Sequence, residues 1–540
     1  MIKKLTLLLT AVFLTCAFVS CDEENKQNPE QPEQPEQPEQ PEDPDKPEEP
    51  EEPAEIVLKN DSDRNMEFDG EKHEKTIAFT APDNWKATAK SQESDWINVS
   101  PTTGVTGEAS FKIRLNVNET GSTRTAVIDI TSGEAKLEIS VKQTSKEAGE
   151  VVNIEIPDAN FKAYLTQNFD SNGDGEISTS EAAKITKIIV SEMNISSLKG
   201  IEHMPALYSL ECNNNTIKEL DLSSNTALIE LYCSVSELEK LNIDNCSKLQ
   251  GLYVNYNKLT ELKLPAECEH LYEVLAIENQ LTTVDLSGAK KLKKIDFENN
   301  QLKELDLSQN MEIKDINLYM NQLTTLTLGE CFHLDYLECS TNQLTSLDVS
   351  LCPKLETLSC EENKLTELNL KNNVDLRTLY CATNEITELD LSTNKHLNEL
   401  YCSWNNLKKL DLSANGELQQ LDCGNNKMEE LNISNSMYLE ELECSNNALT
   451  ALDLSGNLGI INVMCNNNQL AVINTTGCQY LTNLECEENL LTELSIADCP
   501  EIEYINALSN PNLKTIWVWE GFNIDYYSFD VDEGVEFKVK

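Results

Sequence analysis

The chain has 540 residues, which predicts several domains or one repeat array. Its 93 acidic residues outnumber 42 Lys and Arg, giving a formal net charge of −51. Residues 22–55 carry −13 (15 Asp/Glu, 2 Lys), so with +2 for Lys3 and Lys4 residues 56–540 still carry −40. Nucleic acid and anionic lipid both require a clustered basic face, so both are excluded as main partners. The 5 histidines are scattered, and we expect no enzyme.

Residues 1–20 have the pattern of a secretory signal peptide: two lysines precede a mostly apolar stretch, residues 5–19, that is short for a membrane span. Cys21 and an acidic run follow. This arrangement resembles a bacterial lipoprotein signal of the Bacteroidetes type, although Phe18 replaces the leucine usual at that place. The resemblance implies lipidation of Cys21 and an outer-membrane, lipid-anchored protein exposed at the cell surface. Ordinary secretion is the alternative.

An acidic, proline-rich linker is expected over residues 21–54. Proline recurs at every third position from Pro29 to Pro53, and this period matches the three-residue turn of a polyproline II helix. The acidic residues between the prolines repel one another, so the pattern predicts an extended stalk. A proline-rich ligand for a partner's groove is the alternative.

Residues 55–146 alternate between apolar and polar positions in short runs, for example at 76–79 and 137–141. About seven such runs in about 90 residues predict an immunoglobulin-like β-sandwich. The segment resembles the BACON domain of Bacteroidetes proteins, and the matching residues are Asp95-Trp96-Ile97, Ser100-Pro101-Thr102-Thr103-Gly104, Gly107, Arg124 and Val141-Lys142-Gln143. The resemblance implies carbohydrate or mucin binding. A plain spacer role is the alternative, because no aromatic platform is evident.

Residues 150–206 are expected to form a helical cap that contains a calcium loop and a first, atypical repeat. The run from 170 to 181 fits the twelve-residue EF-hand loop at every diagnostic position. Hard Ca²⁺ takes roughly six to eight oxygen ligands, and the expected ligands are Asp170, Asn172, Asp174, Glu176 (through its carbonyl), Ser178 and Glu181. A single loop of this kind predicts one structural Ca²⁺ site. An empty polar turn is the alternative.

From residue 207 the sequence repeats every 21 residues, in 14 copies up to residue 501, one of which (249–270) has 22 residues. The pattern L-x-x-L-x-C-x-x-N-x-L-x-x-L-D-L-S-x-N resembles the short bacterial leucine-rich repeat. Each coil of such a solenoid adds a strand to a parallel sheet, because one repeat alone cannot bury its leucines. Residues 502–540 break the period and are aromatic-rich, so we expect them to cap the last coil.

Two further repeat positions have structural roles. The ninth is Asn in 13 of the 14 copies, with Ser236 as the exception, and an inward amide there can satisfy backbone groups of the following loop. Cysteines recur 21 residues apart, which places them one above the other in the stack, at positions 212 and 233 and at 339, 360, 381, 402, 423, 444, 465 and 486. Apolar residues fill this position in other copies, so we expect free, buried thiols rather than disulfides.

Side chains beside the buried Leu and Cys of each inner strand should face solvent on the concave side. Aromatic residues supply large contact area there at little entropic cost, and the candidate ligand-binding residues are Tyr253, Tyr256, Tyr319, Tyr336, Tyr380, Tyr401 and Trp404. The β-propensity of tyrosine is the alternative explanation. Acidic residues on similar faces, such as Glu361, Asp422 and Glu443, favour a basic protein patch or a hydroxyl-rich glycan.

The expected fold class is therefore α+β and multidomain: an immunoglobulin-like β-sandwich followed by a leucine-rich repeat solenoid with a parallel β-sheet, mostly β and coil. We expect a monomeric surface lipoprotein that binds a macromolecule, either a host protein or a glycan such as mucin, through the concave face. The alternative is a scaffold or accessory subunit of a surface complex for polysaccharide uptake.

Overall fold

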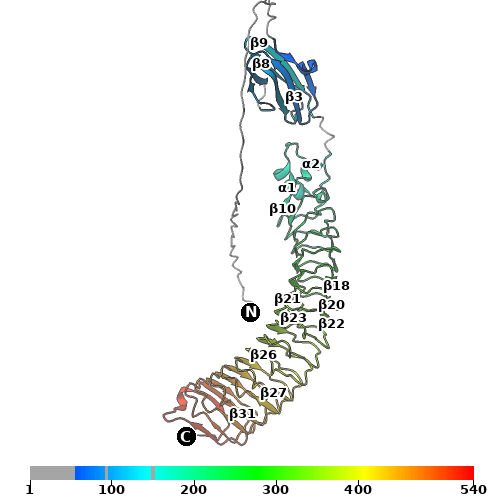
Figure 1. Ribbon diagram of the computed structural model, residues 1–540. Coiled ribbons are helices and arrows are strands. Elements are labelled where there is room, and N and C mark those ends of the chain that lie inside the picture. The colour runs from blue at the N-terminus through cyan, green and yellow to red at the C-terminus, as the bar shows by residue number, and fades with distance from the viewer. Residues whose placement is uncertain (1–54, 92–94, 147–151) are drawn as a thin grey trace, which may run out of the picture. The chain divides into compact units, whose positions relative to one another are not determined.

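The computed structural model describes residues 55–91, 95–146 and 152–540 (Figure 1). The signal peptide, the linker and the candidate lipidation site Cys21 lie outside these residues. The chain forms two compact units, residues 1–148 and 149–540, both mostly β and coil with few helices. No helix in the described ranges is long and apolar enough to cross a membrane.

The N-terminal unit packs two sheets around one core. The four-stranded sheet has the order β1-β3-β7-β5 and the five-stranded sheet the order β2-β9-β8-β4-β6. The strands are β1 (57–58), β2 (65–68), β3 (73–81), β4 (85–91), β5 (97–100), β6 (103–104), β7 (107–115), β8 (124–132) and β9 (135–143). Phe79, Trp85 and Phe111 form the aromatic centre of this core, with ring centroids 5.0–6.1 Å apart.

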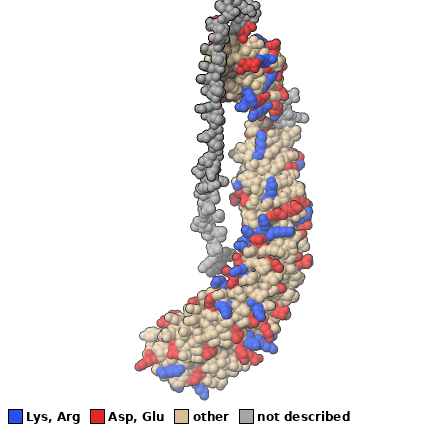
Figure 2. Space-filling model, viewed as in Figure 1, with Lys and Arg blue, Asp and Glu red and all other residues tan. Residues whose placement is uncertain are grey.

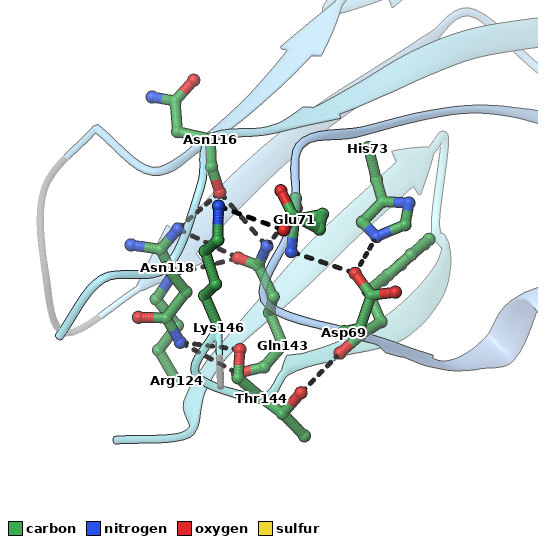
Figure 3. Close-up of polar contacts among 10 residues, drawn as sticks. Asp69, Glu71, His73, Asn116, Asn118, Arg124, Gln143, Thr144 and Lys146 are labelled. Atoms are coloured by element: carbon green, nitrogen blue, oxygen red, sulfur yellow. Dashed lines mark hydrogen bonds and ion pairs between the residues drawn. The ribbon is translucent and has the colours of Figure 1, made fainter. Parts of the chain in front are cut away.

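A polar cluster closes one end of this unit (Figure 3). The Arg124 guanidinium donates to the backbone oxygen of Asn116 (2.7 Å) and to the side-chain oxygen of Gln143 (2.9 Å), and it lies 4.6 Å from the centre of the Trp96 ring. Buried Asn118 donates to the backbone oxygens of Gln143 and Thr144. Three residues of the BACON-like pattern thus hold two loops onto the last strand, β9.

The second unit begins with two short helices, α1 (159–169) and α2 (179–182), and continues as a parallel solenoid. One 17-stranded parallel sheet runs along it on the inner side of its curve (Figure 1). Its strands, in order, are β10 (187–189), β11 (209–211), β13 (230–232), β15 (251–253), β17 (273–275), β19 (294–296), β21 (315–317), β23 (336–338), β24 (357–359), β25 (378–380), β26 (399–401), β28 (420–422), β30 (441–443), β32 (462–464), β34 (483–485), β36 (504–507) and β38 (528–531). We call this sheet the concave sheet.

Shorter parallel sheets lie on the opposite side of the coils, with Leu at the centre of most strands. Their strands are β12 (219–221), β14 (240–242), β16 (261–263), β18 (283–285), β20 (304–307), β22 (325–328), β27 (409–411), β29 (430–432), β31 (451–453), β33 (472–474), β35 (493–495), β37 (515–518) and β39 (536–539). Most coils present two strands, and leucines from both sides meet in one continuous core.

The repeated Asn residues form a hydrogen-bonded ladder inside this core. Asn405 Nδ2 donates to the backbone oxygens of Cys381 and Cys402, and its Oδ1 accepts from the amide of Ile386. The neighbouring coils repeat this pattern, and Asn510 adds a rung beyond the sequence-defined copies. The ladder thus satisfies backbone groups that the loops leave buried.

All 16 described cysteines are free and buried, which confirms the prediction of unpaired thiols. Burial raises the pKa of Cys381 and Cys486, each to about 12, so these thiols stay protonated at neutral pH. They pack in the core as small apolar side chains.

The regular coils also continue through residues 502–518, where strands β36 and β37 extend both sides of the solenoid. The last strands, β38 and β39, bring Phe529 and Phe537 to 5.8 Å from one another, and both rings pack against the end of the core. This aromatic packing covers the last coil.

Candidate functional site

The concave sheet presents two outward side chains per strand. In Glu399-Leu400-Tyr401 the central leucine is fully buried, whereas its two neighbours are half-buried and face outward. The same residues of adjacent strands stand in register, for example Tyr380 beside Tyr401. The sheet therefore arranges outward side chains in rows that cross the strands.

Four of the predicted aromatic residues, Tyr253, Tyr336, Tyr380 and Tyr401, lie in strands of the concave sheet. The other three, Tyr256, Tyr319 and Trp404, lie in the segments that follow β15, β21 and β26. Tyr232 and Tyr253 stack with ring centroids 4.5 Å apart, and Tyr380 and Tyr401 lie 5.0 Å apart. Among the described residues, Trp404 makes no ring contact with the second pair. The structure thus brings four tyrosines together in two pairs, and no ring of residues 55–91, 95–146 or 152–540 stacks on Trp404.

Hydrogen bonds to the next strand hold the paired tyrosines in place. Tyr253 Oη donates to Glu273 (2.6 Å) and Tyr380 Oη donates to Glu399 (2.7 Å). Burial, followed by this hydrogen bond, raises the pKa of Tyr253 and of Tyr380. Part of the role of these tyrosines is therefore structural, but their ring edges remain partly accessible.

A left-handed backbone residue follows each inner strand, and here the sequence departs from what folding favours. Asn tolerates this conformation best among non-glycine residues, and Asn occupies it at 214, 299, 425, 446 and 467. Glu, Thr or Ser occupies it at 192, 278, 341, 362, 383, 488 and 509. Large apolar or aromatic residues stand at the same place in four further coils, namely Val235, Tyr256, Met320 and Trp404. Trp404 (φ 55°) is 63% exposed and Tyr256 (φ 56°) is 50% exposed.

Because these side chains are exposed, their burial does not offset the free-energy cost of the left-handed backbone conformation. Folding alone therefore does not account for them. Val235 and Met320 were missed by sequence reasoning because they are not aromatic. Their signal was the repeat position they share with Trp404. The remaining predicted residues are Tyr319, which follows β21 and is 36% exposed, and Tyr336, which is 37% exposed at the start of β23.

The C-terminal half of the concave sheet is acidic. Burial, together with the charges of Asp422 and Glu485, raises the pKa of Glu443. Burial and the charge of Glu338 likewise raise the pKa of Glu361. The neighbouring negative charges therefore make ionisation of these carboxyl groups less favourable. Such a surface favours a cationic ligand over an anionic one.

The predicted calcium loop lies between α1 and α2. Asp170 accepts from the amides of Gly173 (2.7 Å) and Gly175 (2.8 Å), while Asn172 accepts from Asp174 and Asp174 from Glu176. These bonds turn the polar side chains back onto their own loop.

Glu181 closes the loop from α2. Its carboxylate accepts from the amides of Ser171 and Ser178, and these hydrogen bonds lower its pKa to about 2. A β-bridge between Asn153 and Ser178 anchors the same segment. No three His, Cys, Asp or Glu side chains of the described ranges gather as a metal cluster. The oxygen donor types suit Ca²⁺, and the calcium site stays a prediction.

Comparisons with known proteins agree with this architecture. Residues 60–146 match the family model of the Viral BACON domain. No curated protein matches the chain. Among solved structures, the functional domain of InlJ from Listeria monocytogenes, which includes a cysteine ladder, has 26% identity and a TM-score of 0.50, covering 69% of this chain and 83% of that chain.

Two others have lower scores. An internalin (inlF) from Listeria monocytogenes has 20% identity and a TM-score of 0.42, covering 67% of this chain and 98% of that one. YopM from Yersinia enterocolitica has 22% identity and a TM-score of 0.44, covering 70% and 80%. The chain thus joins a segment that matches a BACON domain to a solenoid similar to bacterial leucine-rich repeat proteins, a fold that typically serves as a binding scaffold rather than an enzyme.

Proposed function

We propose that this protein is a cell-surface lipoprotein that binds a partner protein through its concave sheet. The observation that carries the proposal is the exposure of Trp404 and Tyr256 in left-handed positions where Asn is the less strained choice. Exposed aromatic side chains that folding does not require are typical of binding surfaces. Solenoids offer such extended concave surfaces to their partners.

The other segments support presentation of that surface. A lipid on Cys21 would anchor the chain, and the proline-rich linker would separate the domains from the membrane. The BACON-like unit serves as a spacer in this proposal, because its family-pattern residues Trp96, Arg124 and Gln143 are engaged in internal contacts. A Ca²⁺ ion held by the loop at 170–181 would stabilise the first coils.

The proposal is tested by binding residues 55–540 to an immobilised panel of extracellular-matrix proteins and glycans. The test variant is Tyr401→Ala/Trp404→Ala. The matched control is Tyr438→Ala/Tyr480→Ala, which removes two exposed tyrosines located in the turns before β30 and β34, at the other end of the inner strands from Trp404. Binding to a protein that is lost only in the test variant is the expected result. Binding confined to glycans, or equal losses in both variants, would contradict the proposal.

A further inference from the structure

The C-terminal half of the concave sheet is hollowed into a groove of ≈ 510 Å³, lined by residues from β26 to β34. Tyr401 and Met464 supply apolar wall, whereas Asp422 and Glu443 supply carboxylates. Glu485 belongs to the same row of outward side chains as Met464 and Glu443, because β30, β32 and β34 pair in register. We call these five residues the acidic groove.

Hydrogen bonds hold the carboxylates of the acidic groove in position. Asp422 accepts from Ser403 Oγ (2.7 Å), and Glu443 accepts from the amide of Ser445 (2.8 Å). Glu485 accepts from Asn466 Nδ2 (3.2 Å). These are neutral donors, so the negative charges are fixed in place but are not neutralised.

Charge pairing differs between the two halves of the sheet. In the N-terminal half, Lys187 pairs with Glu211 at 2.8 Å and Lys294 with Asp315 at 3.2 Å. The concave-sheet strands from β24 to β36 contain no Lys or Arg, and within the described ranges the carboxylates of the acidic groove form no ion pair. Elsewhere, both signs of charge are interspersed on the visible face of the repeats (Figure 2).

The apolar wall decides which kind of cation fits. A hydrated metal ion gains nothing from Tyr401 or Met464, and no metal cluster is present in the described ranges. Lys and Arg have apolar stems that pack on such walls while their charged ends reach carboxylates. Asp422 and Glu443 lie on adjacent strands, about 4.8 Å apart, and Glu485 lies two strands beyond Glu443. The row therefore suits several cationic side chains of one segment.

From this arrangement we infer that the acidic groove binds a Lys- and Arg-rich segment of the partner protein. The inference rests on the proposed function, since it names the part of the partner that the concave sheet recognises. It also explains why no Lys or Arg of the described residues pairs with this acidic row.

The experiment measures the affinity of residues 21–540 for fluorescein-labelled (Gly-Ser-Lys-Arg)₄ by fluorescence anisotropy, with (Gly-Ser-Glu-Gln)₄ as the probe of opposite charge. The test variant is Asp422→Asn/Glu443→Gln/Glu485→Gln, which keeps side-chain size and removes three charges. The control is Glu367→Gln/Glu388→Gln/Glu430→Gln, which removes three charges from exposed residues on the opposite side of the coils. This control is needed because a chain of net charge −51 attracts any polycation.

The expected result is a loss of basic-peptide affinity of at least about tenfold in the groove variant and of less than about threefold in the control. Equal losses in both variants would overturn the inference, because attraction would then come from net charge alone. The protein panel separates the two proposals. If a partner protein no longer binds the Tyr401→Ala/Trp404→Ala variant but still binds the groove variant, the proposed function stands and the inference of a Lys- and Arg-rich segment is refuted.

Discussion

Replacing Asn405 by alanine tests the claim that the Asn ladder stabilises the solenoid. The side chain is buried and makes bonds to two coils: Nδ2 donates to Cys381 O (3.0 Å) and Cys402 O (3.2 Å), and Oδ1 accepts from Ile386 N (2.9 Å). Alanine removes these three bonds and a fourth, from Nδ2 to Ser403 O (3.2 Å). Cys381 O still accepts from Asn384 and Cys402 O from Asn426, so the group left buried without its partner is the amide of Ile386. A lost partner costs about 1–3 kcal/mol for each buried group, so with one orphaned amide we expect a loss of about 1–3 kcal/mol in the free energy of unfolding.

Urea unfolding followed by circular dichroism measures this loss. Asn405→Asp should cost at least as much, because a carboxylate cannot donate to the two carbonyls. The neighbouring residue gives the control: Asn406 is half-buried and accepts from Lys427 Nζ in a solvent-exposed bond, so Asn406→Ala should change stability by no more than about 0.5 kcal/mol. If Asn405→Ala and Asn406→Ala lowered the free energy of unfolding by the same amount, the ladder would not stabilise the solenoid and the reasoning would be refuted.

Four other predictions concern single sites. Trp404→Asn should raise the free energy of unfolding by about 0.5–1 kcal/mol, because Asn relieves the left-handed strain, while weakening partner binding; unchanged stability in calorimetry would show that no strain is relieved. Arg124→Met should lower the melting temperature of the N-terminal unit alone, since its bonds to Asn116 and Gln143 are internal to that unit; a shift of the solenoid transition would contradict this. Because the folded pKa of Glu181 is lowered from 4.5 to about 2, its stabilisation is complete above about pH 4.5 and is lost as the pH falls toward 2. Hydrogen exchange of residues 152–206 should show this loss, and Glu181→Gln should abolish it. The same measurement at neutral pH should show slower exchange with Ca²⁺ than without it, and an unchanged rate would argue against the calcium site.

The repeat pattern was sufficient to predict the parallel sheet, the buried thiols and the inward Asn residues, because each follows from a position that recurs in every coil. The pattern did not predict the coils beyond residue 501, because the residue types at the repeat positions change there although the same positions remain buried. Ile502, Ile505, Ala507 and Asn510 occupy the Leu, Leu, Cys and Asn positions of the pattern and are all buried. A pattern of residue size and polarity would have found them.

Other features of the site depend on backbone conformation and on neighbours from distant coils. The sequence does not reveal that Trp404 has φ 55°, so its strain became evident only in the structure. The tyrosine pairs could be predicted from the period, but their hydroxyl bonds to Glu273 and Glu399 depend on which residue the next strand presents. The acidic groove was likewise not predictable from the repeat pattern, because it depends on the absence of Lys and Arg from several neighbouring strands.

The central claim is that a partner protein occupies the concave sheet, and a hydrogen-exchange footprint tests it most directly. Exchange of residues 152–540 would be compared with and without a partner found in the panel. The account predicts slower exchange in and beside the concave-sheet strands between residues 357 and 485. Protection confined to the opposite strands, such as 409–411 and 430–432, or to the N-terminal unit would contradict it.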